Sequence, residues 1–276
     1  SGMIALGADN HEIDDSDLIR VEDSAVTGRI PANRKVLSIL PLDYTLDGQS
    51  GIRDPRGMTG VRLEISANVI SALTPNYNNL VKAVGEIAKV QATRIIPSVM
   101  AAAAAVLSER QRENGVAVID LGAATTSVAI YEEGDLQYVG VIPMGSSNVT
   151  NDLAICLEID ADTAEEVKLK HVSADFSESD KEIRTKCGNE EIVFTKYEMN
   201  EIVKARLSEI FERVGKLLKA AHYDRRLPEG VVLVGAGAKM RGIDKFAKTV
   251  LQTAVKIGTP SGLLGVSESV EKPEFA

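Results

Sequence analysis

The strand patterns around which the rest of the chain is organised lie in its middle, at residues 115–145. A run of four apolar residues, 116–119, ends on the carboxylate of Asp120 and predicts a buried strand. Two further segments, 125–131 and 136–142, also have strand patterns and are joined by a Glu-Glu-Gly-Asp turn. The pattern therefore predicts two hairpins that share their middle strand.

The pattern ahead of these hairpins predicts a small α+β unit over residues 1–94. Acids after Ile13 precede an apolar stretch and suit the capped start of a helix. A glycine-rich, charged loop at 48–60 separates two long alternating segments. We expect strands over 3–6, 35–47, 61–72 and 90–96 and an amphipathic helix over 75–88.

Outside the central hairpins, residues 95–276 have mostly helical patterns. Ser147 or Asn148 can cap one helix, and Asp162 begins a second in the manner of a capping box. The polar stretch 173–189 is expected to be mobile or a hairpin. The remaining predicted elements are helices over 97–113, 196–221 and 244–251, with a buried strand over 231–234. The chain is therefore predicted to be α/β with two domains.

Composition narrows the classes of function. Of the 276 residues 44% are hydrophobic, which is enough for a substantial core, and 31 Lys and Arg against 40 Asp and Glu give a net charge of −9. This charge disfavours nucleic acid as a partner. Cys156 and Cys187 lack metal-ligand spacing, and no apolar run of 18 residues occurs. We expect a cytoplasmic protein without a structural metal.

The turn after the first central strand carries the candidate chemistry. Small residues, Gly122 and Ala123, let backbone N–H groups approach an anion, and Thr125 and Thr126 offer hydroxyls. Asp120 could hold a cation or its waters. A phosphate-binding hairpin and an ordinary tight hairpin both fit this pattern.

This Asp-x-Gly-x-x-Thr-Thr stretch resembles the hairpin that grips nucleotide phosphates in the actin, sugar-kinase and heat-shock-chaperone superfamily. The resemblance implies an actin-like (ribonuclease H-like) ATPase fold that binds ATP with Mg²⁺. In that superfamily the predicted helix 97–113 is similar to the one linking two lobes, and residues 95–276 would form the second lobe.

The loop at 47–64, DGQSGIRDPRGMTGVRLE, narrows the resemblance. It is similar to the signature of the FtsA family of bacterial cell-division proteins, within the small α+β subdomain that this family inserts into its first lobe. The segment 149–154, VTNDLA, is also close to the usual FtsA wording. An ordinary surface loop between two strands is the alternative interpretation of 47–64.

Two further groups gain a role only through the resemblance. Glu165 and Lys168 share a helix face at i, i+3, which by itself predicts a surface ion pair, but the superfamily uses a Glu and a Lys against adenosine. The turn after strand 231–234 is common in isolation, yet it resembles the adenosine-binding turn. Its implied ligand-binding residues are Gly235, Ala236, Gly237 and Lys239.

Arg206 falls on the apolar stripe of the predicted helix 196–221. It could extend to water or pair with Glu209 at i+3. FtsA-like proteins present an arginine from the matching helix to the acidic C-terminal tail of FtsZ, and this is the functional alternative.

The chain also departs from the family pattern. Ala123, Ala124 and Ala236 stand where glycines are usual, and each methyl would weaken binding if its backbone φ were positive. Ile96 replaces a glutamate and cannot orient water. No phosphate loop precedes residue 1 and no amphipathic membrane helix follows, since the last residues, 268–276, are acidic and short. We therefore expect a fragment truncated at both ends.

The resulting hypothesis is a cell-division scaffold, at most a weak ATPase, with loose or absent nucleotide binding in this chain. It would form actin-like filaments and contact other divisome proteins through residues 1–94. It would also link FtsZ to the inner face of the cell membrane, to which the full-length protein would attach peripherally. The alternatives are a PilM-like pilus-assembly protein and a sugar-kinase-like phosphotransferase in which Asp120 would act as the base.

Overall fold

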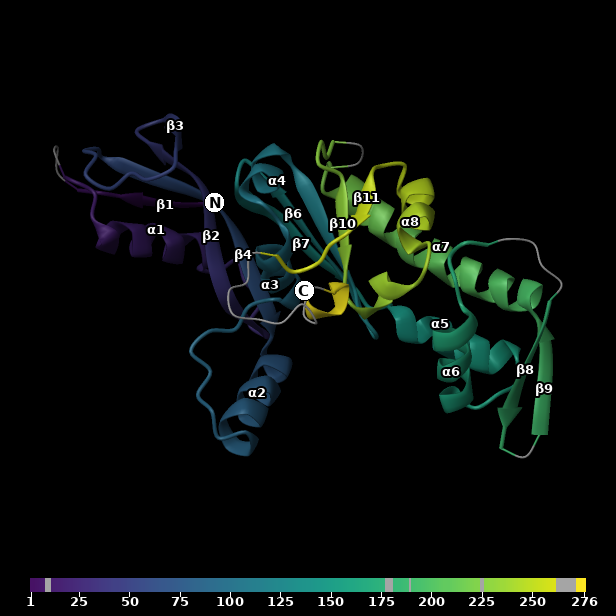
Figure 1. Cartoon of the computed structure of the whole chain (residues 1–276). Helices are drawn as coiled ribbons and strands as arrows, with labels where there is room; N and C mark the ends of the chain where they lie inside the picture. The colour runs from purple at the N-terminus through teal and green to yellow at the C-terminus, as the bar shows by residue number, and fades with distance from the viewer. Residues whose placement is uncertain (8–10, 177–180, 189, 224–225, 262–271) are drawn as a thin grey trace. The chain divides into compact units, whose positions relative to one another are not determined.

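The computed structural model describes residues 1–7, 11–176, 181–188, 190–223, 226–261 and 272–276 (Figure 1). The chain divides into two compact units, Ser1–Pro97 and Ser98–Ala276. Among the described residues, no helix combines the length and the apolar character needed to cross a membrane.

The first unit is built on an antiparallel sheet with the strand order β1-β4-β2-β3. Helix α1 starts at the predicted acids because the side chain of Asp14 accepts hydrogen bonds from the backbone N–H groups of Ser16 and Asp17. Val21 of α1 and Leu63 of β4 belong to the core between helix and sheet. The bounds are β1 Gly2–Ala5, α1 Asp15–Val26, β2 Arg34–Leu46, β3 Gln49–Ile52 and β4 Arg62–Leu73.

The chain leaves this sheet through α2, Thr74–Lys82, which continues as a π-helical turn, Ala83–Ile87. The predicted helix over 75–88 is thus confirmed, although none of its residues is buried. The strand predicted over 90–96 is wrong, because the chain there is irregular and pairs with no described strand. A short apolar segment is not stable as a strand without a partner edge.

The second unit is organised around a mixed sheet with the strand order β11-β10-β5-β6-β7. β5, β6 and β7 pair antiparallel, so the two predicted hairpins with a shared middle strand are confirmed. β10 lies parallel to β5 on the other side. The bounds are β5 Val116–Leu121, β6 Thr126–Glu132, β7 Asp135–Ile142, β10 Val231–Val234 and β11 Val255–Ile257.

Six α-helices accompany this sheet in the described part of the second unit. The single helix predicted over 97–113 is wrong, since two helices occupy that range. The second of them starts anew because the hydroxyl of Ser108 accepts a hydrogen bond from the backbone N–H of Gln111. The helices are α3 Ser98–Val106, α4 Glu109–Asn114, α5 Ser146–Cys156, α6 Ala161–His171, α7 Lys196–Ala220 and α8 Ile243–Leu251.

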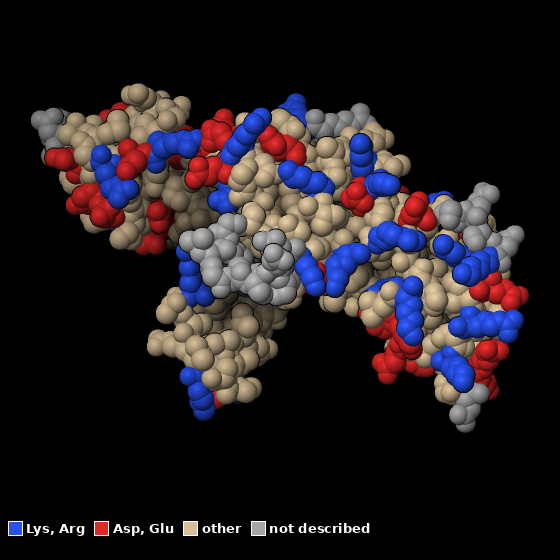
Figure 2. Space-filling view, viewed as in Figure 1, with Lys and Arg blue, Asp and Glu red and all other residues tan. Residues whose placement is uncertain are grey.

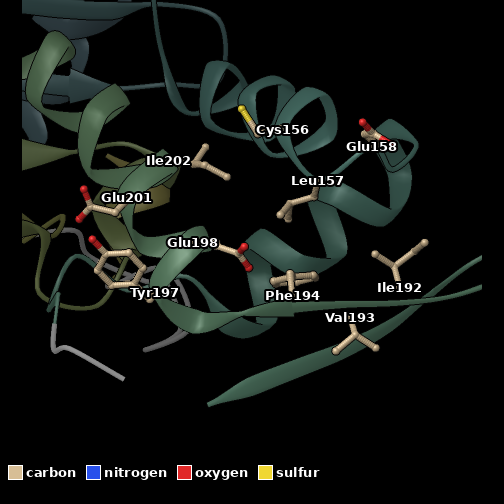
Figure 3. A pocket seen from close by; sticks show the side chains of 10 residues that line it. All are labelled: Cys156, Leu157, Glu158, Ile192, Val193, Phe194, Tyr197, Glu198, Glu201 and Ile202. Atoms are coloured by element: carbon tan, nitrogen blue, oxygen red, sulfur yellow. The ribbon is translucent and has the colours of Figure 1, made fainter. Parts of the chain in front are cut away.

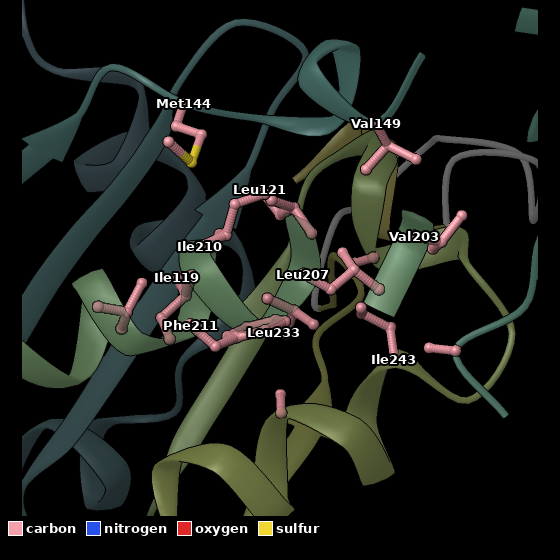
Figure 4. Packing of buried hydrophobic residues seen from close by; sticks show 14 of the residues in the cluster. Ile119, Leu121, Met144, Val149, Val203, Leu207, Ile210, Phe211, Leu233 and Ile243 are labelled. Atoms are coloured by element: carbon pink, nitrogen blue, oxygen red, sulfur yellow. The ribbon is translucent and has the colours of Figure 1, made fainter. Parts of the chain in front are cut away.

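The long helix α7 supplies the centre of the core. Leu207, Ile210 and Phe211 of α7 are fully or almost fully buried in one cluster with Ile119 of β5 and Leu233 of β10 (Figure 4). Because the apolar stripe of α7 covers the sheet at β5 and β10, the ends of these two strands are held in a fixed relation. The candidate site lies at those ends.

The polar stretch between α6 and α7 contains a strand of a small hairpin. β8, Glu182–Cys187, pairs antiparallel with β9, Glu190–Thr195, which leads directly into α7. Part of the predicted excursion, at 177–180 and 189, lies outside the described residues. The described part agrees with the hairpin alternative.

Candidate functional site

Asp120 and Gly235 meet at the carboxyl ends of two neighbouring inner strands of the sheet. β5 and β10 are parallel, with Asp120 opposite Val234, so the residue after β10 comes to rest beside the Asp120 side chain. Adjacent parallel strands have their carboxyl ends on the same side of the sheet, so the turns that follow them lie close together. Two sequence-predicted groups, the Asp120 hairpin and the glycine turn, are therefore adjacent.

The hairpin turn closes with one hydrogen bond, from the backbone N–H of Gly122 to the carbonyl oxygen of Thr125, 3.0 Å. Within the described chain, no hydrogen bond from the N–H groups of Ala123, Ala124 or Thr125 is found, and all three residues are exposed. Successive unpaired amides form a concave site that suits an anion such as a phosphate group.

The carbonyl groups of the same turn point toward the start of α5. Gly122 O accepts hydrogen bonds from the backbone N–H of Ser146, 2.9 Å, and from its hydroxyl, 3.0 Å. Ala123 O accepts one from the N–H of Ser147, 2.9 Å. The first amides of α5 are therefore satisfied by the hairpin rather than by a ligand.

Thr125 and Thr126 differ in what they offer a ligand. Thr125 is exposed, whereas Thr126 is completely buried and its hydroxyl donates to Met144 O at 2.8 Å. Adjacent residues of a strand point to opposite faces, which separates the two. Thr126 was predicted to contact the cofactor, and its position in the structure leaves no hydroxyl for one.

Asp120 is partly buried, and this burial raises the pKa of its carboxyl group, with a smaller lowering by the Ser98 hydroxyl 3.4 Å away. No group of three or more His, Cys, Asp or Glu side chains that could hold a metal occurs in the described residues. Mg²⁺ usually keeps several waters and binds proteins through one or two carboxylates plus phosphate oxygens. A single aspartate beside an anion site fits that kind of ion.

The glycine turn is shaped by Gly235, whose φ of +86° lies in the left-handed region. Gly237 sits so close to Leu121 that an added Cβ would collide with its side chain. None of Ala123, Ala124 and Ala236 has a positive φ, so the condition under which these methyls would strain the backbone is not met. These alanines fit the turns as they stand.

Lys239 ends the short helical turn that follows Gly235. Its ammonium pairs with the carboxylate of Glu274 at 2.8 Å, and the N–H of Gly235 donates to Pro273 O at 2.9 Å. The segment 272–276 therefore lies on the glycine turn. Sequence analysis did not predict this contact, because the partners are more than thirty residues apart.

Glu165 and Lys168 form a compact trio with Thr150 of α5. The Thr150 hydroxyl donates to Glu165 at 2.5 Å, Lys168 donates to the Thr150 oxygen at 2.9 Å, and Lys168 pairs with Glu165 at 2.6 Å. Burial opposes ionisation of Glu165, but hydrogen bonds from Lys168 and Thr150 outweigh it and lower the pKa of the carboxyl group. No recorded hydrogen bond or ion pair in the described chain joins this trio to Asp120 or the glycine turn.

Arg206 lies largely buried between α5 and α7. Its guanidinium binds both carboxylate oxygens of Asp152, at 2.6 and 2.8 Å, and also Glu209 at 2.7 Å. The hydrogen bonds from Arg206 to Asp152 raise the pKa of the guanidinium. The predicted pairing with Glu209 is confirmed, and the stronger partner, Asp152, was missed.

A pocket of about 500 Å³ opens at the start of α7, between the end of α5 and β9 (Figure 3). Its lining combines apolar side chains with the carboxylates of Glu158, Glu198 and Glu201. Sequence analysis missed it, because its lining comes from three separate elements. The lining residues are Cys156, Leu157, Glu158, Ile192, Val193, Phe194, Tyr197, Glu198, Glu201 and Ile202.

Comparison with known families identifies the chain. A model of the cell division protein FtsA matches residues 117–276, and a model of the SHS2 domain inserted in FtsA matches residues 1–71. The chain belongs to the FtsA family. The resemblance predicted from the loop at 47–64 is thereby confirmed.

Curated FtsA proteins align with all or nearly all of the chain. FtsA of Pseudomonas aeruginosa is 32% identical over 279 residues, which cover 100% of this chain and 66% of the relative. FtsA of Bacillus subtilis is 34% identical over 265 residues, covering 95% and 60%. The chain therefore spans less than two thirds of the length of these FtsA relatives.

Solved structures confirm the predicted actin-like α/β fold. MreB5 of Spiroplasma citri bound to ADP has a TM-score of 0.58 at 22% identity, over 68% of this chain and 62% of its own. A PilM–PilN type IV pilus biogenesis complex reaches 0.60 at 16%, over 99% and 74%. A MamK double helical filament reaches 0.53 at 17%, over 72% and 62%. At these identities the likeness of this FtsA-family chain to the three proteins is one of fold.

Proposed function

We propose that the second unit binds an adenine nucleotide, ATP or ADP, with Mg²⁺ at the carboxyl ends of β5 and β10. The observation that carries this proposal is the meeting of Asp120, the unpaired amides of the hairpin turn and the positive-φ glycine turn at one place. Two crystal structures of the related fold, both of MreB5, contain ADP or AMPPNP.

Each group has a role in this proposal. The N–H groups of Ala123, Ala124 and Thr125 would bind phosphate oxygens, and Asp120 would hold Mg²⁺ through water. Gly235, Ala236 and Gly237 would let the nucleoside approach the backbone, with Lys239 at the end of the turn. Glu165 and Lys168 would contact the adenosine. The Mg²⁺ ion would neutralise phosphate charge.

Equilibrium dialysis of the chain against labelled ATP with Mg²⁺ tests the proposal. We expect weak, saturable binding that Asp120→Asn reduces and that Asp162→Asn, an exposed acid elsewhere in the unit, leaves unchanged. Sub-micromolar affinity would contradict the expected looseness. Absence of binding at millimolar nucleotide would contradict the proposed site.

We also propose that the role of the nucleotide is to support a scaffold rather than a turnover reaction. A ligand that binds one conformation better shifts the population toward it, and this could favour self-association into filaments. Membership of the FtsA family and the MamK filament of the same fold support this proposal. Sedimentation of the chain with and without ATP and Mg²⁺ measures it, and equal pelleting in both would refute the coupling.

Arg206 is the proposed contact for the acidic C-terminal tail of FtsZ. In the structure its guanidinium is occupied by Asp152 and Glu209, so a tail carboxylate would replace one of these partners. Exchange of one carboxylate for another keeps the buried guanidinium paired. Glu209, if it is the partner displaced, keeps its pair with Arg213. Such an exchange also predicts that the resident carboxylate competes with the tail.

Calorimetry with a peptide copied from the FtsZ tail tests this exchange. We expect Arg206→Ala to abolish binding and Asp152→Asn to strengthen it, because the amide is a weaker competitor for the guanidinium. Arg213→Ala is the matched control, since Arg213 pairs with Glu209 on the same helix but is half exposed. Binding that is the same in the wild type and in Arg206→Ala would remove Arg206 from the site.

Two further assignments complete the proposed role as a link between FtsZ and the membrane. Residues 1–94 would contact other divisome proteins, and attachment to the inner face of the membrane would be peripheral. Pull-down of divisome proteins by the chain, with and without competing isolated peptides from residues 47–64, would locate the first of these contacts.

A further inference from the structure

Four hydrogen bonds join the phosphate-binding candidate hairpin to the segment 144–147 that leads into α5. The hydroxyl of Thr126 donates to Met144 O, and Ser146 donates twice to Gly122 O. The N–H of Ser147 donates to Ala123 O. A Cβ at Gly145, which lies between them, would collide with the carbonyl of Ala123, so only glycine permits this approach.

Because the peptide bond is planar, these contacts determine the direction of the neighbouring N–H groups. The carbonyl of one residue and the N–H of the next lie in one plane and point in opposite directions. When the carbonyls of Gly122 and Ala123 face α5, the N–H groups of Ala123 and Ala124 must face away from it, on the exposed side of the turn. The contacts to 144–147 therefore decide which way the candidate anion-binding amides point.

We propose that Ser146 and Thr126 are positioning residues that hold these amides toward a phosphate group. The proposal rests on the proposed nucleotide binding, and it gives Thr126 a different role from the ligand contact predicted from the sequence. Thr126 fixes Met144, and Ser146, two residues later, fixes Gly122 with its hydroxyl as well as its amide.

The side chains of these residues contribute what the backbone alone would not. Any residue at 146 can donate its N–H to Gly122 O, but only a hydroxyl adds the second bond to the same oxygen. Loss of the Thr126 hydroxyl would leave Met144 O without this partner in a fully buried place. The Oδ1 of Asn148 accepts the N–H of Gly145 at 2.9 Å and orders the same segment.

The test compares binding of ADP with Mg²⁺ and of adenosine in five variants of the chain. We expect Ser146→Ala and Thr126→Val to weaken ADP binding by roughly three- to tenfold, the worth of one hydrogen bond, and to leave adenosine binding unchanged. Ser146→Thr and Thr126→Ser keep a hydroxyl and should restore ADP binding. Ser147→Ala is the matched control, because Ser147 uses its backbone amide in this contact.

Amide NMR spectra of the free chain separate the two proposals. We expect the Ala123 and Ala124 amide resonances to shift in Ser146→Ala and Thr126→Val and to return in the hydroxyl-bearing variants. Unchanged resonances, or a parallel loss of ADP and adenosine binding, would overturn the positioning role. If the wild type binds neither ligand, the nucleotide proposal fails, and the resonances of Ala123 and Ala124 still decide whether Ser146 and Thr126 direct the turn.

Discussion

Gly235 lies directly against Asp120, so that a Cβ added at position 235 would stand 2.5 Å from Asp120 Oδ1 and 2.7 Å from Leu121 O. The turn therefore depends on glycine both for its φ of +86° and for space. This contact joins the two predicted halves of the nucleotide site.

Gly235→Ala should destabilise the chain by about 1–3 kcal/mol, because the left-handed backbone and the collision both penalise a side chain. Gly215→Ala is the matched control. Gly215 lies inside α7, and its nearest neighbour to an added Cβ is Leu251 at 3.8 Å, so the alanine should stabilise by about 0.5–1 kcal/mol. Urea unfolding measures both, and equal effects would contradict the packing described for Gly235.

Asp120→Asn should raise the melting temperature at neutral pH while it reduces Mg²⁺-dependent nucleotide binding. Burial raises the pKa of Asp120 in the folded chain, so the folded state holds its proton more tightly than the unfolded state. Stability then falls as pH rises from the ordinary aspartate pKa through the raised one, and asparagine removes that loss. A melting series from pH 3 to 7 checks the slope.

Asp160→Ala provides the opposite case. Hydrogen bonds from the Cys187 thiol and from the N–H and hydroxyl of Thr163 lower the pKa of Asp160. Its contribution to stability is therefore present above the ordinary aspartate pKa and is lost as pH falls. Asp160 is the N-cap residue of α6. The alanine variant should melt lower than the wild type at pH 7, and a higher melting temperature would contradict this capping role.

Arg206→Ala should cost about 1.5–3 kcal/mol of unfolding free energy. It removes hydrogen bonds between charged groups and leaves the largely buried Asp152 carboxylate without its arginine partner. Arg213→Ala should cost less than about 1 kcal/mol, as expected for an exposed pair. Urea unfolding distinguishes them. A negligible effect of Arg206→Ala would show that the Asp152 pair does not stabilise the contact between α5 and α7.

Tyr223 should titrate later than an ordinary tyrosine. Burial, and then the hydrogen bond to Glu132 at 2.7 Å, raise the pKa of its hydroxyl to about 12. The folded state keeps this proton, so the stability it contributes is full below pH 10 and is lost as pH rises toward 12. An ultraviolet titration of the wild type and Tyr223→Phe isolates the late phase, with the exposed Tyr197→Phe as control.

The elements that the sequence predicted well are those with strong local patterns. β5 to β7 followed from apolar strand patterns and turn residues, and α7 from its long apolar stripe. The failures have local causes too. The segment 90–96 has an apolar pattern but pairs with no described strand, and Ser108 starts a new helix inside a range that composition made uniformly helical.

The candidate site was predicted only as far as residue types could take it. Asp120 and the glycine turn were identified by motif, and their adjacency required the pairing of β5 with β10. Thr125 is exposed and Thr126 is buried because their side chains lie on opposite faces, and the motif alone does not show which face each takes. Asp152 lies 54 positions from Arg206, a separation at which spacing alone says nothing about contact.

Helix α5 carries contacts of three kinds within two turns: Ser146 to the hairpin, Thr150 to Glu165 and Lys168, and Asp152 to Arg206. Successive residues of a helix are rotated by about 100°. Insertion or deletion of one residue between Ser146 and Asp152 would therefore turn Asp152 away from Arg206 even if the hairpin contact survived. The six-residue step between these two positions sets the angular phase of the proposed FtsZ-binding arginine relative to the proposed phosphate site.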